Sequence, residues 1–289
     1  CERFGSFPQG MWPSEGSVCQ AMIPLLARHG IRWIATDEEI LGCSTHGRVG
    51  RDGRGHVRYP DLLYRPWKVQ EGGQELAIVF RDHALSDQVG FHYQRSPGHV
   101  AAGDFQAKLH AIGNACRHNP ATLVPVILDG ENCWEYFPDG GVSFLRNLYQ
   151  NIARDPRLQP VTVGEFLREH PPVEALPRLF SGSWISHNFA IWIGHEEDNR
   201  GWDALHQTRT FLVSEAASGR HAPATLSRAW DELYIAEGSD WFWWYGDDHS
   251  SALDGLFDHL FRKHLRNVYQ LLGADPPGDG ADRGHRHRV

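Results

Sequence analysis

The sequence predicts an α/β protein, in which a parallel barrel-like sheet is followed by a helical domain. Short apolar runs end abruptly in polar residues, segments of helical period separate these runs, and the second part of the chain is mostly helical. Continuous apolar runs are typical of parallel strands, because helices cover both faces of a parallel sheet. A chain of 289 residues is long enough for one large barrel-like unit or for two smaller units.

Four apolar runs share one pattern, in which each run leads to acidic or basic residues. They are found in the segments GMWPSEGSV, IRWIATDEEIL, ELAIVFRDHALSD and VPVILDGENCWEYF. The polar residues at their ends include Glu15, Asp37, Arg81, Asp82, His83 and Asp129. Active sites of barrels gather where strands end and loops begin, so we expect these side chains to lie on one rim.

The remaining elements define the expected domain organisation. The segment QPVTVGEFLREH predicts one more short strand and a helix that Thr162 caps. We assign residues 1–175 to the catalytic barrel and residues 176–273 to a helical domain that contributes to the active-site cleft. Two amphipathic patterns support the helical domain, one in NRGWDALHQTRTFLVSEAAS and one from residue 251 to 272. We expect the tail, residues 274–289, to be disordered.

Composition limits the possible partners. The net charge of −8 argues against nucleic acid, which is bound by basic residues that neutralise phosphates. No apolar run is long enough to span a membrane, so we expect no membrane partner and a soluble, cytoplasmic protein. The five cysteines form no C-x-x-C pair and indicate neither a disulfide framework nor a zinc site. The chain begins at Cys1 without a leader, which suggests a missing N-terminus.

Two carboxylates fit the hydrolysis of a glycosidic bond, which needs one group to protonate the leaving oxygen and another to attack or to activate water. Glu15 and Asp129 each lie at the end of a predicted strand and are each followed by glycine. Trp12 and Trp134 are close to them in sequence and suit stacking on a sugar ring. Taken alone, Asp129 and Gly130 are also typical of an ordinary turn.

Further polar and aromatic clusters are candidates for substrate contacts. The segment RDHALSD either binds sugar hydroxyls or braces the strand end, and EGSDWFWWYGDDHSS combines a core aromatic cluster with at least one ring that lines a groove. His187 is either a sugar contact or a structural histidine. The expected substrate-binding residues are Trp12, Asp37, Arg81, Asp82, His83, Glu131, Trp134, His187, Asp240, Trp241 and Trp244. No H-E-x-x-H motif is present, so we expect neither a metal nor another cofactor.

The motifs GMWPSEG, WIATDE, FRDHALSD, LDGENCWEYFPDGG and EGSDWFWWYGDDHSS, in this order, resemble the signature regions of glycoside hydrolase family 57, in particular its α-amylase and amylopullulanase-like branch. The resemblance implies a (β/α)7 barrel followed by a helical domain, and cleavage or transfer of α-glucans with retention of configuration. It also implies that Glu15 is the nucleophile, that Asp129 is the general acid/base, and that Trp241 or a neighbour closes over the substrate.

One departure from the family pattern affects the expected fold. The first family region, a His-Gln-Pro at an early strand, is absent. We therefore expect an incomplete barrel that lacks its opening strands and has a less complete pocket.

The leading hypothesis is a retaining glycoside hydrolase or transglycosylase that acts on α-glucans such as starch, glycogen, pullulan and malto-oligosaccharides. A metal-dependent polysaccharide deacetylase is one alternative, and a non-catalytic barrel that binds glucan through its tryptophans is another. The sequence does not distinguish hydrolysis from transfer, α-1,4 from α-1,6 linkages, or the oligomeric states.

Overall fold

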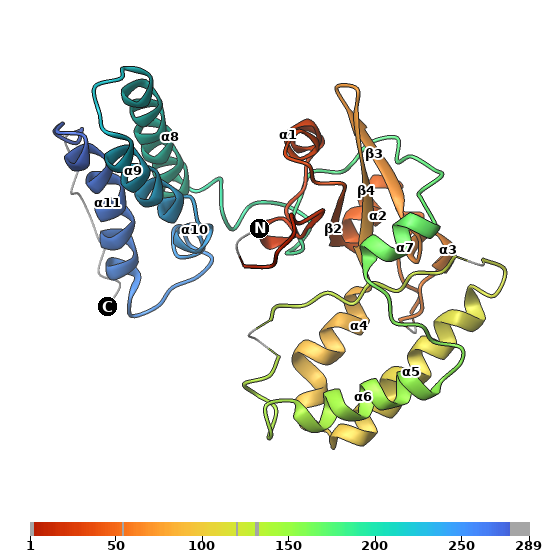
Figure 1. The fold of residues 1–289 in the computed structure, drawn as a ribbon. Helices are drawn as coiled ribbons and strands as arrows, with labels where there is room; N and C mark the ends of the chain where they lie inside the picture. Colours follow the sequence, from red (N-terminus) through yellow and green to blue (C-terminus); the bar gives the residue numbers. More distant parts are fainter. Residues whose placement is uncertain (1–2, 54, 120, 131–132, 278–289) are drawn as a thin grey trace. The chain divides into compact units, whose positions relative to one another are not determined.

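The computed structural model describes residues 3–53, 55–119, 121–130 and 133–277. The chain forms two compact units, Cys1–Asn188 and Phe189–Val289 (Figure 1). The first unit carries the sheet and the second is helical. The units therefore divide after Asn188, whereas the sequence places the end of the barrel at residue 175. The cleft-forming role of residues 176–273 stays a prediction, and most of the expected tail lies outside the described residues.

The sheet of the first unit has four strands in the order β1-β2-β4-β3 among the described residues. The strands are β1 (Gly10–Met11), β2 (Trp33–Asp37), β3 (Trp67–Glu71) and β4 (Gln74–Arg81). The pairs β1–β2 and β2–β4 are parallel, and Asp37 stands opposite Arg81 in the register. The polar ends of two predicted apolar strands therefore meet at one edge.

Strand β3 was not predicted, and it pairs with β4 in an antiparallel hairpin. Gly72 and Gly73 form the turn, with φ of 54° and 74°. Two central residues with positive φ match the right-handed twist of a tight hairpin, and glycine adopts this conformation without steric cost. The result is a mixed sheet in which one edge is antiparallel.

The expected strand before Asp129 is not formed. The described segment 123–129 has no regular secondary structure and makes isolated hydrogen bonds, such as Leu123 N to Tyr64 O at 2.9 Å and Asp82 N to Pro125 O at 2.9 Å. Pro125 has no backbone N–H and cannot donate to a ladder. The strand expected at 159–161 is also absent, but Thr162 caps the following helix as predicted, with Glu165 completing a capping box.

The first unit contains seven α-helices in its described part. They are α1 (Ile23–Arg28), α2 (Glu38–Ser44), α3 (Pro60–Leu63), α4 (His83–Asp87), α5 (Gly98–Ala115), α6 (Val142–Arg154) and α7 (Val163–Glu169). Pro24 lies in the first turn of α1, where its missing N–H has no intrahelical partner to lose. Pro24 is therefore compatible with the start of this helix.

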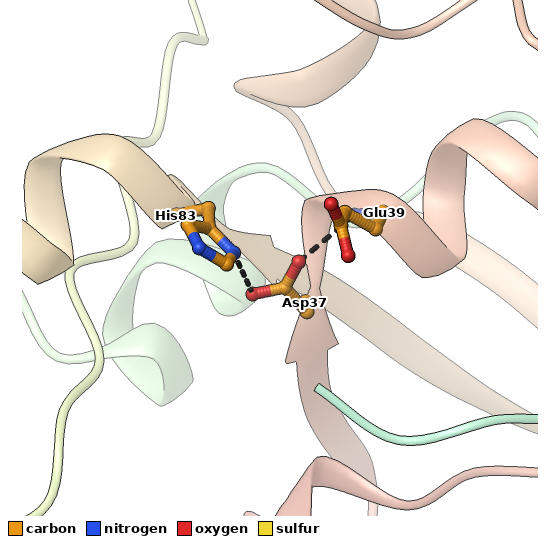
Figure 2. Close-up of side chains that lie close together, drawn as sticks. All are labelled: Asp37, Glu39 and His83. Carbon is orange, nitrogen blue, oxygen red and sulfur yellow. Dashed lines mark hydrogen bonds and ion pairs between the residues drawn. The ribbon is translucent and has the colours of Figure 1, made fainter. Parts of the chain in front are cut away.

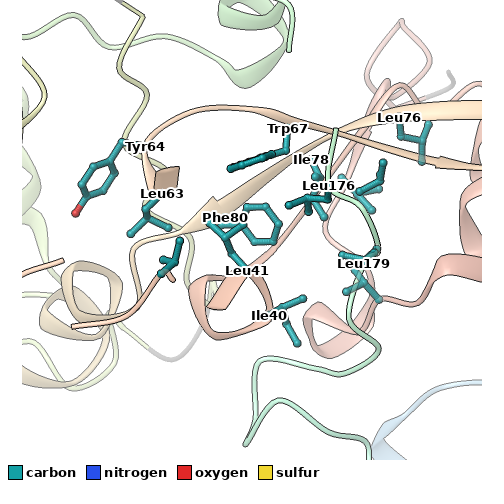
Figure 3. Packing of buried hydrophobic residues seen from close by; sticks show 14 of the residues in the cluster. Ile40, Leu41, Leu63, Tyr64, Trp67, Leu76, Ile78, Phe80, Leu176 and Leu179 are labelled. Atoms are coloured by element: carbon teal, nitrogen blue, oxygen red, sulfur yellow. The ribbon is translucent and has the colours of Figure 1, made fainter. Parts of the chain in front are cut away.

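Apolar side chains of the sheet and the surrounding helices form the main core. Figure 3 shows Phe80 and Ile78 of β4 beside Leu41 of α2, together with Leu176 and Leu179 of the late loop. A second core fills the space between α5 and α6, which lie side by side in Figure 1. The main core thus anchors the strands whose ends carry the polar residues.

The second unit consists of α8 (Glu196–Ala217), α9 (Pro223–Ala236), α10 (Asp240–Trp243) and α11 (Asp254–Leu271) within its described residues. The two long predicted helices are confirmed, and Gly273 follows the last one with φ of 71°. Phe211 of α8 stacks on Tyr269 of α11 with ring centroids 4.5 Å apart. A search of the described residues finds no helix with the length and hydropathy needed to cross a membrane.

Candidate active site

Glu15 occupies a strained turn that follows β1. Its backbone has φ of 56° and ψ of 25°, in the left-handed region that residues other than glycine rarely adopt. The next residue, Gly16, also has positive φ, and a Cβ there would approach the Trp12 ring to 2.8 Å. Thr36 Oγ1 donates to Gly16 O at 2.6 Å and fixes the turn to β2. Backbone strain of this kind clusters at functional sites, and it presents the half-buried Glu15 side chain in one orientation.

Trp184 reaches the Glu15 turn from the end of the first unit. Its indole Nε1 donates to Glu15 Oε2 at 3.0 Å, and its backbone N–H donates to Glu15 O at 3.1 Å. Val18 and Gly182 form an antiparallel bridge that holds this loop beside the turn. Trp12 makes an edge contact with Trp184, with ring centroids 5.2 Å apart. Two indoles therefore flank the predicted nucleophile.

Asp37 is the centre of a buried ion-pair network at the ends of β2 and β4. Its Oδ2 lies 2.5 Å from Arg81 Nε. The same oxygen lies 3.0 Å from His83 Nδ1, and Oδ1 accepts from Glu39 N at 3.0 Å (Figure 2). Burial opposes the ionisation of Asp37, but the His83 hydrogen bond and the Arg81 charge outweigh it and lower the pKa of the carboxyl. Asp37 is therefore a carboxylate at neutral pH.

His83 is held between two carboxylates. Its Nδ1 contacts Asp37 and its Nε2 lies 3.0 Å from Asp87 Oδ2. These two hydrogen bonds raise the pKa of His83 to about 10. The ring is therefore an imidazolium near neutral pH, with both N–H groups donating.

The side chains of Asp37, Glu39 and His83 have ligand-type atoms within 4.8 Å of one another. A metal ion there would have to displace a proton from His83 and compete with the Arg81 guanidinium for the same Asp37 oxygen. Glu39 Oε2 also lies 3.3 Å from His187 Nδ1. The charge of Asp37 is therefore balanced by protonated His83 and by Arg81, and the donor set fits a metal poorly.

Asp82, at the end of β4, is buried, with only 2% of its surface exposed. Its Oδ2 accepts from Tyr64 Oη at 2.6 Å, and its Oδ1 accepts from Arg51 Nη2 at 2.7 Å and from Leu85 N at 2.8 Å. Arg51 also pairs with the buried Glu38, with Nη2 2.5 Å from Oε2. Both oxygens of Asp82 accept hydrogen bonds from protein donors. This favours the interpretation that Asp82 braces the end of the strand over the interpretation that it binds sugar hydroxyls.

The segment that leads to Asp129 is tied to the same network. Arg81 Nη1 donates to Ile127 O at 3.2 Å, and Cys133 Sγ donates to Asp129 O at 3.2 Å. Asp129 is half-buried, and Trp134 packs beside Phe137 with ring centroids 5.6 Å apart. Glu131 lies outside the described residues. Arg81 thus connects the end of β4 to the backbone near the second predicted catalytic carboxylate.

Comparison with known proteins identifies the family of the chain. The model of glycosyl hydrolase family 57 matches residues 1–177, more than half of the sequence. The chain belongs to glycosyl hydrolase family 57. The resemblance seen in the sequence motifs is thereby confirmed, and the match includes Glu15, Asp129 and the whole Asp37 network.

Solved structures of three enzymes have a similar fold. A family 57 branching enzyme from Thermococcus kodakaraensis matches with a TM-score of 0.70 and 15% identity, over 86% of this chain and 53% of that one. The α-amylase AmyC from Thermotoga maritima matches with a TM-score of 0.68 and 17% identity, over 94% of this chain and 60% of that one. A 4-α-glucanotransferase from Thermococcus litoralis matches with a TM-score of 0.62 and 14% identity, over 93% of this chain and 43% of that one.

These similarities establish the fold class. The chain has the α/β fold of family 57, an incomplete (β/α)7 barrel followed by a helical domain, as predicted. It spans about half the length of the branching enzyme that it matches.

The helical unit of this family 57 chain holds the remaining predicted residues. Trp241 Nε1 donates to Ile235 O at 3.0 Å, and Trp244 stacks on Phe257 with ring centroids 5.3 Å apart. Asp240 is exposed in the first turn of α10. Both predicted rings therefore make packing contacts within their own unit.

The first unit brings three of the predicted residues together around one residue that was not predicted. Trp184 connects Glu15 and Trp12 with Arg81, whose Cζ lies 4.7 Å from the Trp184 ring centroid. The sequence around it, SGSWISHN, offered a tryptophan among polar residues, but only His187 was singled out there. Nothing in local sequence indicates a contact with a glutamate so far away along the chain.

Proposed function

We propose that this protein is a retaining glycoside hydrolase or transglycosylase that acts on α-glucans. Glu15 is the nucleophile and Asp129 is the general acid/base. The family match over residues 1–177 carries the proposal, because both carboxylates lie within it. The similar structures are a branching enzyme, an α-amylase and a 4-α-glucanotransferase, which supports α-glucan as the substrate class.

The proposed reaction has two displacements. In the first, a Glu15 oxygen attacks the anomeric carbon while the glycosidic C–O bond breaks and Asp129 gives its proton to the leaving oxygen. In the second, Asp129 takes a proton from water or from an acceptor sugar, and the oxygen of that molecule displaces Glu15. Hydrolysis and transfer thus share one covalent intermediate and differ in the acceptor.

The surroundings of Glu15 support its role as the nucleophile. A nucleophilic carboxylate has to be ionised and oriented, and a hydrogen bond donated to a carboxylate favours the charged form. The Trp184 indole N–H supplies such a bond at 3.0 Å. The left-handed backbone of Glu15 and the packing of Gly16 against Trp12 restrict where the side chain can point.

Asp129 has a different requirement, because an acid catalyst must hold a proton near neutral pH. It is half-buried, and it follows an apolar segment whose Val126 and Leu128 pack in the second core of the unit. An apolar surrounding favours the protonated form of a carboxyl. This division of roles between two carboxyl groups is typical of retaining glycosidases.

Substitution of each carboxylate followed by product analysis tests the proposal. Glu15→Gln and Asp129→Asn should each reduce the release of sugar from amylose or malto-oligosaccharides by at least about a thousandfold, because each removes a group that takes part in the reaction. Thin-layer chromatography of the products reports cleavage and transfer together. The exposed Glu71→Gln variant is the matched control and should retain the native rate.

Chemical rescue separates the two roles. Azide should restore turnover of Asp129→Ala with a glycosyl azide of retained configuration, and turnover of Glu15→Ala with inverted configuration. A native rate in Glu15→Gln would refute the proposal. The opposite pattern of azide products would exchange the assigned roles.

A further inference from the structure

Arg81 is a buried cation that the catalytic scheme does not yet use. Only 5% of the residue is exposed. Its Nε pairs with Asp37, its Nη1 donates to Ile127 O and lies 3.6 Å from Asp87 Oδ1, and its Cζ lies over the Trp184 ring. The guanidinium therefore touches β2, α4, the segment before Asp129 and the loop that carries Trp184.

The contact with Trp184 leads to Glu15. A cation over the face of an indole is attracted by the ring electrons, and the contact is stronger where water is excluded. The same indole donates its N–H to Glu15 Oε2 at 3.0 Å. Because hydrogen-bonding groups that touch one another polarise one another, the charge of Arg81 strengthens the indole as a donor.

The contact with Ile127 leads to Asp129. Ile127 lies two residues before Asp129, in a segment that lacks a strand ladder. Individual hydrogen bonds therefore hold this segment, among them Arg81 Nη1 to Ile127 O and Ile127 N to Ser86 Oγ at 3.1 Å. Loss of the Arg81 bond would free the backbone that precedes the predicted acid.

We propose that Arg81 is a positioning residue that aligns both catalytic carboxylates, Glu15 through the Trp184 indole and Asp129 through the Ile127 carbonyl. The inference rests on the proposed function of Glu15 and Asp129. It differs from the sequence-based expectation that Arg81 binds substrate, because the buried guanidinium is engaged by protein partners. Arg81 thus affects the reaction rate more than the binding of the sugar.

A double-mutant cycle between Arg81 and Trp184 tests the proposal in the full-length protein. Arg81→Met should lower kcat by about tenfold to a hundredfold, the scale of a small misalignment of reacting groups, with KM changed less than about twofold. Trp184→Phe keeps an aromatic ring but removes the N–H, and it should also lower kcat. In the Trp184→Phe background, Arg81→Met should lower kcat by a clearly smaller factor than it does in the native protein, because the two side chains act through one contact.

A spectroscopic signal reports the same contact without turnover. The indole 1H–15N resonance of Trp184, assigned by its loss in Trp184→Phe, should move in Glu15→Gln and in Arg81→Met. Arg81→Lys keeps the charge without the planar group and should shift the resonance less than Arg81→Met does. Arg65, whose Cζ lies 4.1 Å from the Trp67 ring centroid, provides the matched control, and Arg65→Lys should leave the Trp184 resonance in place.

Several results would overturn the inference. These are additive losses in the cycle, a raised KM with unchanged kcat, or an unmoved Trp184 resonance in Arg81→Met. If Arg81→Met does not fold, the kcat values of Arg81→Lys and Trp184→Phe test the positioning role of Arg81. Native kcat values in both variants would overturn the inference. An active Glu15→Gln enzyme refutes the proposed function instead, whereas the resonance still reports whether Arg81 acts on the indole.

Discussion

Two arginines of the first unit lie over tryptophan rings, and their surroundings differ. Arg81 stacks on Trp184 and pairs with Asp37, whose side chain is 0% exposed. Arg65 stacks on Trp67 and pairs with Glu174, whose side chain is 59% exposed. The same pair of residue types is therefore a fixed part of the candidate site in one place and a surface contact in the other. Burial, more than geometry, decides how much each arginine contributes to the stability of the fold.

The largest difference between the two arginines is expected in stability. Arg81→Met leaves the Asp37 carboxylate buried without its guanidinium partner and should lower the free energy of unfolding by about 3–5 kcal/mol. Arg65→Met leaves Glu174 in contact with water and should cost about 1 kcal/mol or less. Urea unfolding followed by circular dichroism measures both values. Equal losses would contradict the role assigned to burial.

The two tryptophans provide the next comparison. Trp67 Nε1 donates to Leu62 O at 2.8 Å in the main core, whereas Trp184 Nε1 donates to Glu15. Trp67→Phe should cost about 1–2 kcal/mol of stability, because a partly buried carbonyl loses its donor, and should leave kcat near the native value. Trp184→Phe should lower kcat about tenfold or more, as expected for a misplaced nucleophile. Kinetics and unfolding measured on the same samples would show whether the two effects separate.

The Arg81 network is expected to make a pH-dependent contribution to stability between neutral and alkaline pH. The pKa of His83 in the folded state is about 10 and its ordinary value is 6.5, so the protonated ring stabilises the fold. This stability is fully present below about pH 6.5 and is lost as pH rises toward 10. His83→Gln should flatten the loss of stability over this range, in an environment that also contains Asp37, Asp87 and Arg81. A native pH profile in His83→Gln would contradict the imidazolium assignment.

The smallest effect is expected from metal removal. Because protonated His83 and Arg81 already balance Asp37, a chelator should leave both activity and thermal midpoint unchanged. Added Zn²⁺ or Ca²⁺ should not raise the thermal midpoint, whereas binding to the native state would raise it. Loss of activity in the chelator would favour the deacetylase alternative.

The sequence predicted the elements whose pattern is local. Apolar runs gave the strands β2 and β4, and amphipathic periods gave the long helices of the second unit. The sequence also placed Asp37, Arg81 and His83 on one rim, and the parallel pairing of β2 with β4 brings these strand ends to one edge. The ion pairs among them were not predicted. Each of the predicted features depends on spacing within a short segment or on the direction of neighbouring strands.

Features that depend on distant partners were missed. Trp184 meets Glu15, and Arg51 meets Asp82, through contacts between segments that no local pattern connects. The prediction of a strand before Asp129 was wrong, because an apolar segment forms a strand only where a neighbouring strand offers free backbone donors and acceptors. The sequence shows that position 15 is a glutamate, but it does not show that an indole from a distant part of the chain lies beside it.

Mass spectrometry of a trapped intermediate tests the central claim, that Glu15 is the nucleophile, most directly. A 5-fluoro-α-glucosyl fluoride should leave a glycosyl group on the peptide that contains Glu15, and the same treatment of Glu15→Gln should leave that peptide unmodified. A glycosyl group on a different carboxylate of the native protein, with Glu15 unmodified, would contradict the assignment.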